Sequence, residues 1–123
     1  MQKSTDKKQI YIVDDDESVC RALKLHMVSY GFAVETFLSA EEFFSAVPDS
    51  APGCLILDIH MPGLNGWEAQ QRLRRTGCKR HVIVITGDKN FSFKEQALKA
   101  GAKGFLQKPF DGQELVDMVN LAC

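Results

Sequence analysis

Five short apolar runs, separated by longer amphipathic segments, constrain the fold of this chain most strongly. Each run is continuous rather than alternating in polarity, which is typical of strands that are buried on both faces of a parallel sheet. The predicted strands are 10–13, 34–37, 55–57, 81–85 and 105–106, and the predicted helices are 17–30, 39 towards 48, a segment after 66, 92–100 and a last one from 111. Right-handed crossovers leave few topologies for such a chain. The pattern therefore predicts an α/β fold, a doubly wound five-stranded parallel sheet of order 2-1-3-4-5 with five helices.

Local signals fix the starts of two of these helices and leave a third uncertain. The stretch Ser39-Ala40-Glu41-Glu42 has the form of a capping box, and so does Asp111-Gly112-Gln113-Glu114. The segment after Gly66 has a weaker period, because Gln70 and Gln71 stand where apolar residues are expected. We therefore expect a helix there with uncertain packing.

Composition excludes several classes of protein. The 123 residues suit one domain, predicted at 9–123 after a flexible tail at 1–8. A formal charge of −1 gives no overall attraction to nucleic acid or to anionic membrane, and no apolar run approaches the roughly 20 residues of a membrane helix. No signal peptide is recognised, so the expected location is the cytoplasm.

The four cysteines are spaced too far apart for a zinc site. No C-x-x-C pair is present, and a chain of this size does not need a disulfide framework. We therefore expect reduced thiols, with Cys20 and Cys54 serving as small core residues because they fall in apolar patterns.

Acidic residues end two of the predicted strands. Asp14, Asp15 and Asp16 follow the first strand, and Asp58 ends the third. In this topology the two strands flank the point at which strand order reverses, where ligands bind at the carboxyl edge of the sheet. Capping of the next helix explains Asp16 and Glu17 but not the two acids before them. Crowded carboxylates repel one another unless a cation lies among them, and these oxygen ligands suit Mg²⁺.

The remaining strand ends supply a hydroxyl and a cation. Thr86 ends the fourth strand, and Lys108 follows the fifth strand directly before Pro109, which favours an extended backbone at the lysine. We expect the ammonium group at the same edge of the sheet, on the far side of Asp58 from the acid pair. This set of groups is a site for a phosphoryl group on a carboxylate, with Asp58 as the nucleophile.

These motifs resemble the receiver domain of bacterial two-component response regulators, which has a flavodoxin-like fold. The resemblance covers the chain from about Gln9, and it is carried by 10-IYIVDDD-16, 55-LILDIHMPGLNG-66, 83-IVITG-87 and 97-ALKAGAKGFLQKPF-110. Each motif alone is weak, but together and in this order they are highly specific. Within the family, the stretches 84-VITGD-88 and 100-AGAKGFLQKPF-110 are similar to regulators of the nitrogen-fixation (LuxR-type) sub-family, which carry a helix-turn-helix output domain.

The resemblance implies a role for each matching position in metal and phosphate binding. Asp58 matches the phosphoacceptor, which takes the phosphoryl group from the phosphohistidine of a sensor histidine kinase. Asp15 would bind Mg²⁺ directly and Asp14 chiefly through water. The main-chain carbonyl of His60 would be a further metal ligand, in a place where small or basic residues are frequent.

The resemblance also implies how the signal is passed on. Thr86 and Lys108 match the residues that contact the phosphoryl group, and Phe105 matches the aromatic switch position. The face formed by the fourth helix, the fifth strand and the fifth helix would change and control an output, typically transcription. Homodimers on phosphorylation are expected, whereas direct binding of DNA by this chain is not, because the charge is −1 and no helix-turn-helix is present. Such a chain is not a conventional enzyme, but it catalyses its own phosphotransfer and dephosphorylation.

Three other functions fit the sequence less well. An aspartyl-phosphate phosphatase of the haloacid dehalogenase type needs a second Asp two residues after the nucleophile, and His60 stands there. A flavodoxin-like cofactor binder needs a Ser/Thr/Gly-rich phosphate loop after the first strand, where Asp14–Asp16 would repel phosphate. A degenerate receiver that acts only as a docking module is disfavoured, since every position of the phosphorylation set is present.

Overall fold

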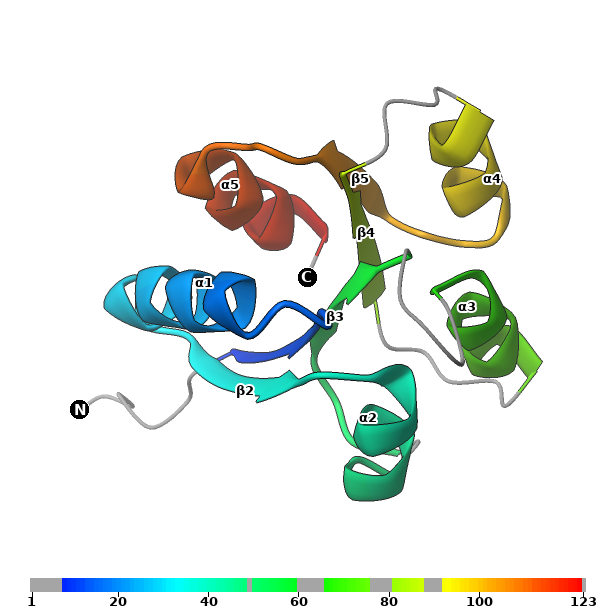
Figure 1. Ribbon diagram of the computed structural model, residues 1–123, viewed down its shortest axis with the longest axis horizontal. Coiled ribbons are helices and arrows are strands. Elements are labelled where there is room, and N and C mark those ends of the chain that lie inside the picture. Colours follow the sequence, from blue (N-terminus) through cyan, green and yellow to red (C-terminus); the bar gives the residue numbers. More distant parts are fainter. Residues whose placement is uncertain (1–7, 49, 60–65, 76–80, 88–91, 123) are drawn as a thin grey trace.

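Five parallel strands form the centre of the structure, a computed structural model that describes residues 8–48, 50–59, 66–75, 81–87 and 92–122 (Figure 1). The strands are β1 (Gln9–Val13), β2 (Ala33–Phe37), β3 (Cys54–Asp58), β4 (His81–Thr86) and β5 (Gly104–Gln107). Their order in the sheet is β2-β1-β3-β4-β5, and all four pairings are parallel. The predicted topology is therefore confirmed. The tail predicted at 1–8 lies outside the described residues except for its last residue.

Helices cover both faces of this sheet. They are α1 (Glu17–Ser29), α2 (Ala40–Ala46), α3 (Gly66–Arg75), α4 (Ser92–Lys99) and α5 (Gly112–Ala122). Figure 1 shows α1 and α5 on one face and α2, α3 and α4 on the other. A parallel sheet that is covered on both sides buries its strands almost completely, which is why the apolar runs are continuous in the sequence.

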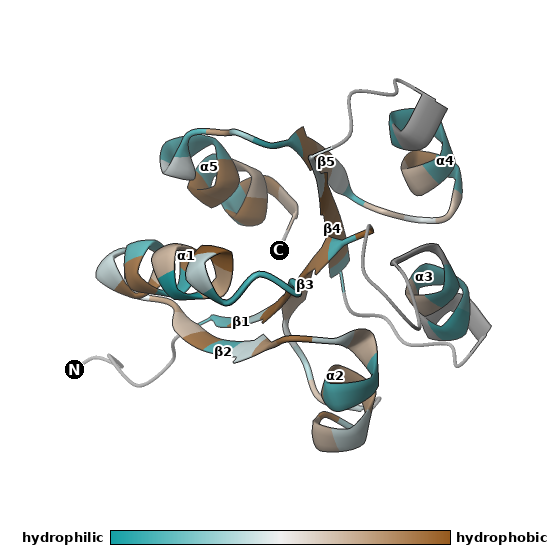
Figure 2. Ribbon diagram, viewed as in Figure 1, coloured by the Kyte–Doolittle hydropathy of each residue, from teal (hydrophilic) through white to brown (hydrophobic). Residues whose placement is uncertain are grey.

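Successive strand residues point into two separate cores. In β1, Ile10 and Ile12 pack with residues of α1 and α5, whereas Tyr11 and Val13 pack with residues of α2, α3 and α4. All four side chains are buried. Figure 2 shows mostly apolar colours on the central strands β3 and β4, and a mixture of polar and apolar colours on the surrounding helices. The alternation of side chains along a strand thus makes the sheet the shared wall of both cores.

Polar side chains define the starts of three helices. The carboxylate of Asp16 accepts hydrogen bonds from the backbone N–H groups of Ser18 and Val19, and the hydroxyl of Ser39 accepts one from the N–H of Glu42. At the start of α5 the cap is reciprocal: Asp111 Oδ1 accepts from the N–H of Gln113, and Glu114 Oε1 accepts from the N–H of Asp111. The capping groups predicted from the sequence are confirmed.

Two expectations about individual residues need correction or refinement. The uncertain packing of the third helix is resolved because Gln70 is buried and only Gln71 is exposed. Cys20 and Cys54 are core residues as expected, but Cys54 is disulfide-bonded, so the expectation of reduced thiols is wrong for this residue. Spacing along the chain does not reveal such a bond, because it depends on the distance between cysteines in space.

The joint between β5 and α5 depends on a residue without a side chain. Gly104 is buried in β5, and a Cβ atom added there would overlap Met118 Sδ of α5 and lie 2.8 Å from Met118 Cγ. Because the Cγ atom is close to the backbone of α5, the methionine cannot simply swing aside. The absence of a side chain at Gly104 therefore lets α5 pack directly on the strand.

We predict that Gly104→Ala lowers the free energy of unfolding by about 1–3 kcal/mol, as for other overpacked cores. Denaturation in urea measures this, and Gly87→Ala is the matched control because a Cβ at Gly87 meets nothing within 4 Å. Combining Gly104→Ala with Met118→Ala should cost less than the sum of the single changes. Equal losses at Gly104 and Gly87 would contradict the packing argument.

Candidate functional site

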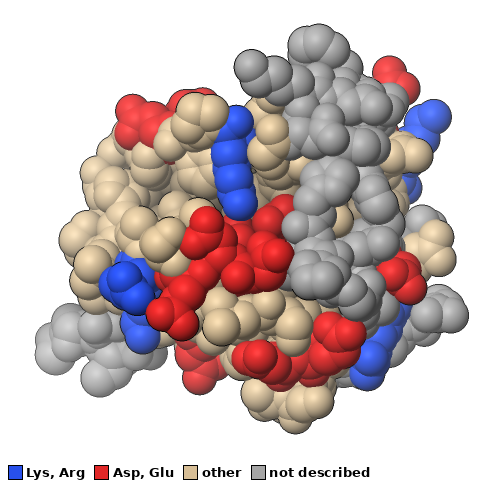
Figure 3. Space-filling model, in the orientation of Figure 1, with Lys and Arg blue, Asp and Glu red and all other residues tan. Residues whose placement is uncertain are grey.

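Three aspartates meet at the carboxyl edge of the sheet. Asp14 directly follows β1 and Asp58 is the last residue of the adjacent β3, while Asp15 is next to Asp14 in sequence. One carboxylate oxygen from each lies within 4.8 Å of those of the other two. Figure 3 shows acidic side chains gathered on this face of the molecule, with a basic side chain beside them. The structure thus brings together the acids that the sequence places at separate strand ends.

Burial differs among the three acids. The residues Asp14 and Asp58 are 0% and 4% exposed, whereas Asp15 is exposed. Removing an ionised carboxylate from water is costly unless a cation or several hydrogen bonds compensate. The two inner acids therefore depend on the groups around them.

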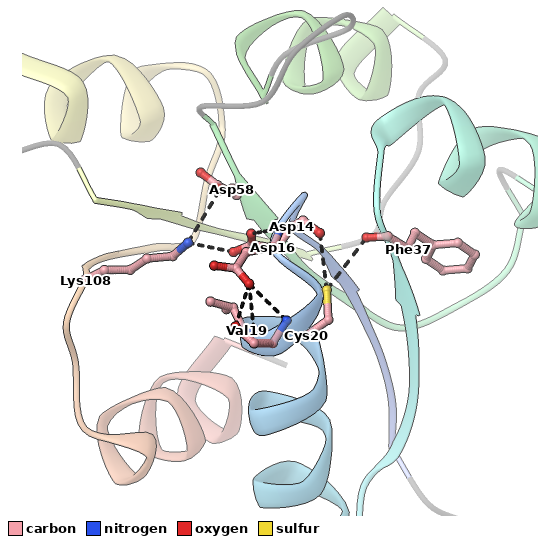
Figure 4. Close-up of polar contacts among 8 residues, drawn as sticks. Asp14, Asp16, Val19, Cys20, Phe37, Asp58 and Lys108 are labelled. Carbon is pink, nitrogen blue, oxygen red and sulfur yellow. Dashed lines mark hydrogen bonds and ion pairs between the residues drawn. The ribbon is translucent and has the colours of Figure 1, made fainter.

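Lys108 supplies that positive charge. Its Nζ lies 2.7 Å from Asp14 Oδ2 and 3.4 Å from Asp58 Oδ2 (Figure 4). The backbone N–H of Lys108 donates to the carbonyl of Thr86 over 2.7 Å, which fixes the lysine at the end of the sheet. Burial alone would lower the pKa of Lys108, but its hydrogen bond to Asp14 and the charges of Asp58 and Asp14 outweigh burial and raise this pKa. The ammonium group is thus held in its charged form.

The expected position of this ammonium group was wrong. We expected it on the far side of Asp58 from the acid pair, and the lysine backbone is indeed beyond β3 and β4 in the sheet order. The long side chain reaches back across the edge, however, so that its Nζ is closer to Asp14 than to Asp58. A backbone position predicts the edge of the sheet but not the end point of four flexible carbon–carbon bonds.

Asp14 is held by its neighbours through both its backbone and its side chain. Its N–H donates to the carbonyl of Phe37 in β2 over 3.1 Å, and its Oδ1 accepts from the N–H of Asp16 over 2.9 Å. The thiol of Cys20 donates to the carbonyl of Asp14 over 3.2 Å (Figure 4). Burial, followed by the charge of Asp14, raises the pKa of Cys20 to about 11, so this thiol stays protonated and can donate. The sequence alone did not predict this contact. Cys20 lies in the first turn of α1, six residues after Asp14.

Asp16 has a separate task beside the acid cluster. The side-chain hydrogen bond from Ser18, followed by backbone hydrogen bonds from Val19 and Ser18, lowers the pKa of Asp16. Its carboxylate is therefore committed to capping α1, as the sequence indicates. The sequence of three aspartates thus divides into two site residues and one cap.

The remaining predicted residues differ in how closely they approach this cluster. Thr86 ends β4 at the same edge and is fully buried, next to Ile85, which pairs with Asp58. Phe105 is half-buried in β5 and packs against the core on the side of α2, α3 and α4. His60 lies outside the described residues, so its expected role remains a prediction.

The donor set fits magnesium. Mg²⁺ prefers carboxylate oxygens and retains several waters, and one exposed acid beside two buried ones leaves room for both. Asp14, Asp15 and Asp58 are the described residues that would hold it. Lys108 already provides one positive charge there, so a bound cation would share these carboxylates with it.

Known proteins match this chain in both sequence and fold. A family model for the response regulator receiver domain matches residues 10–120. The chain belongs to this family. Response regulator protein TodT of Pseudomonas putida is 42% identical over 113 residues, which cover 92% of the receiver domain described here and 50% of TodT. Transcriptional regulatory protein FixJ of Bradyrhizobium diazoefficiens is 35% identical over 118 residues, 96% of this chain and 58% of FixJ.

Solved structures agree with the sequence comparisons. The structure titled FixJ-N superposes with a TM-score of 0.85 at 34% identity, covering 98% of this receiver domain and 93% of that chain. Response regulator StyR gives a TM-score of 0.87 at 38% identity, covering 94% of this chain and 59% of StyR. The resemblance to the nitrogen-fixation type of regulator is therefore supported. The receiver domain spans about half the length of the curated relatives that it matches.

In the part of the receiver domain that the structure describes, none of the helices has both the length and the apolar character needed to cross a bilayer.

We predict that Mg²⁺ stabilises the receiver domain through its acid cluster. At a concentration about tenfold above Kd, binding adds about 1.4 kcal/mol, which corresponds to a rise of about 3–6 °C in Tm. Asp15→Ala should abolish the rise, whereas Asp16→Asn should retain it because Asp16 caps α1. Differential scanning calorimetry with and without EDTA measures this, and an equal rise in all three proteins would place the metal elsewhere.

Proposed function

We propose that this receiver domain is a phosphorylation-activated switch that accepts a phosphoryl group on Asp58 from a sensor histidine kinase. One observation carries the proposal: a carboxylate at the end of β3 lies among two further acids and an ammonium group. A capping or structural acid would not need this surrounding set of charges. The switch would work in the cytoplasm, where the kinase and its ATP are found.

The proposed reaction is a transfer between two nucleophiles. A carboxylate oxygen of Asp58 attacks phosphorus, an O–P bond forms, and the N–P bond to the imidazole of the donor breaks. Mg²⁺, when bound by Asp14, Asp15 and Asp58, would neutralise charge on the phosphoryl oxygens. The ammonium group of Lys108 is already within 3.4 Å of Asp58 and would provide a second positive charge.

Two features of the chain support an ordered site for this reaction. Asp14 is tied to β2 and to α1 by backbone and thiol hydrogen bonds, so it cannot follow Lys108 freely when the charges rearrange. Thr86 is joined to Lys108 through its backbone carbonyl. We propose that the Thr86 hydroxyl donates to the phosphoryl group, and that the later attack of water returns Asp58 to its free form.

The proposed output is a change in the face formed by α4, β5 and α5. Phe105 is half-buried in β5, one residue away from strand positions that are fully covered, so its ring has room to change its exposure. The similarity to TodT and FixJ, both named as regulators, supports control of transcription through a further domain. We propose that phosphorylation makes this face pair with a second copy, while contact with DNA is left to the other domain.

We predict that acetyl phosphate with Mg²⁺ adds one phosphoryl group to the wild-type chain and none to Asp58→Asn. Asp14 and Asp58 both lie beside Lys108. Asp14, however, is fully buried and also accepts the N–H of Asp16, so Asp58 is the acid that we expect to react. Intact-mass spectrometry measures the adduct, and Asp117→Asn, at an exposed aspartate of α5, is the matched control. An undiminished adduct on Asp58→Asn would disprove the assignment, and its absence from the wild type would favour a docking module.

A second prediction separates the chemistry from the signal. Thr86→Ala should still accept phosphate on Asp58, because the nucleophile and its cations are intact, but it should fail to change β5 and its neighbours. Two measurements test this: backbone amide shifts around Phe105, and sedimentation velocity with beryllofluoride. Wild type should turn from monomer to dimer and Thr86→Ala should not. Equal dimerisation of both proteins would remove Thr86 from the switch.

A further inference from the structure

Gln70 is a buried polar residue that the proposed chemistry does not use. It lies in α3 and is 2% exposed, whereas its neighbour Gln71 is exposed. Its Nε2 donates to the main-chain carbonyl of Ala97 in α4 over 3.3 Å. Its Oε1 is buried and accepts no hydrogen bond in the described part of the chain. A buried amide with one half satisfied calls for an explanation, because most buried polar atoms are paired.

The carbonyl that Gln70 contacts belongs to the end of α4. Ala97 O also accepts the backbone N–H of Ala102 over 3.0 Å, and Gly101 between them has φ +101°. These contacts form the turn that closes the helix. The chain then enters β5 directly, where the N–H of Lys103 donates to Val82 O of β4 over 2.7 Å. Gln70 therefore contacts α4 at the point where it is joined to the strand that leads to Lys108.

The other flank of α3 is fixed to α2. The guanidinium of Arg72 lies 4.1 Å from the centre of the Phe44 ring, and Ala69 is buried against the sheet. An Arg–aromatic contact of this kind is favourable, and it leaves α3 attached to its neighbour on that side. On the side of α4, the described residues show a hydrogen bond between the two helices, which the Gln70 amide donates to Ala97.

The two halves of the Gln70 amide act in opposite directions. The bond from Nε2 to Ala97 O favours the arrangement seen here, while the unpaired Oε1 disfavours it. A contact that gains little in net free energy can be broken at little cost. A movement of the end of α4 away from α3 would break this bond. It would also let Oε1 reach a donor or water, which would offset the lost free energy.

We propose that Gln70 is a releasable anchor that holds the C-terminal end of α4 in the unmodified position and so restrains the signalling change in β5. The regulatory part rests on the proposed function, because it requires a phosphorylation-linked change of the α4–β5 segment. The hydrogen bond of Gln70 goes to the backbone of Ala97 and not to a phosphorylation residue, so Gln70 acts as a positioning residue through Ala97.

Two simpler explanations make different predictions. If Gln70 only fills space, an unbranched apolar side chain of similar size should replace it without local effect. If an ordered water satisfies Oε1, the amide is fully paired, and its removal should destabilise the whole domain. Gln70→Met tests both, and Gln71→Met is the matched control one position along the same helix.

The first measurement uses the unmodified protein and amide hydrogen exchange by NMR. In Gln70→Met we expect the Ala102 amide to exchange faster by up to about fivefold, the factor for one whole hydrogen bond, because loss of the unpaired Oε1 offsets part of the effect. Amides of β1 and β3 should exchange as in wild type, and Gln71→Met should change neither set. Unchanged exchange at Ala102 would overturn the anchor and favour simple packing. Uniformly faster exchange at all sites would overturn it in favour of a fully paired amide.

The second measurement adds Mg²⁺ and beryllofluoride. In Gln70→Met without beryllofluoride, the restraint has been removed. We therefore expect the chemical shifts of the amides of 102–107 to lie between those of wild type without and with beryllofluoride. If these chemical shifts coincide with those of wild type without beryllofluoride, Gln70 does not restrain the switch. If wild type itself does not respond to beryllofluoride, the proposed function fails, and with it the regulatory role, while the exchange at Ala102 still decides the anchor.

Discussion

The ion pair between Lys108 and Asp14 is the interaction on which the functional end of this structure depends. Asp14 is fully buried, and burial of a charged carboxylate is costly unless a cation is paired with it. The Nζ of Lys108 is 2.7 Å away and is shared with Asp58 at 3.4 Å. Removing one partner from a buried pair typically costs about 3–5 kcal/mol. Among the described residues, the ammonium group of Lys108, which follows β5, thus pairs with the acids at the ends of β1 and β3.

The order of the sheet determines why these groups can meet. Parallel strands all present their carboxyl ends at one edge, and β1 and β3 are neighbours although 44 residues lie between their last residues, Val13 and Asp58. The same arrangement places α2, α3 and α4 together on one face. The strand β5 therefore connects two sets of contacts. It follows the end of α4, which contacts α3, and it leads to Lys108 at the edge of the sheet.

Much of this was predictable from the sequence, for physical reasons. Continuous apolar runs predict strands buried on both faces, and capping groups at Ser39 and Asp111 predict helix starts because their hydrogen bonds are local. Other features were not predictable. The reach of the Lys108 side chain, the burial of Gln70 and the disulfide at Cys54 depend on distances between segments that are far apart in the chain. Periodicity marked Gln70 as an irregularity but could not show which helix it would meet.

The cation among the acids is a side chain of the protein, so its presence does not depend on the ions in solution. An ammonium group that belongs to the chain cannot be washed away, diluted or chelated. Scarcity of divalent ions would therefore stop the proposed phosphorylation chemistry, while the ion pair at the edge of the sheet persists. The proposed phosphotransfer thus needs a cation from the surroundings, whereas the ion pair of Lys108 does not. A cell that runs short of magnesium would retain a folded, though less stable, protein that cannot accept phosphate.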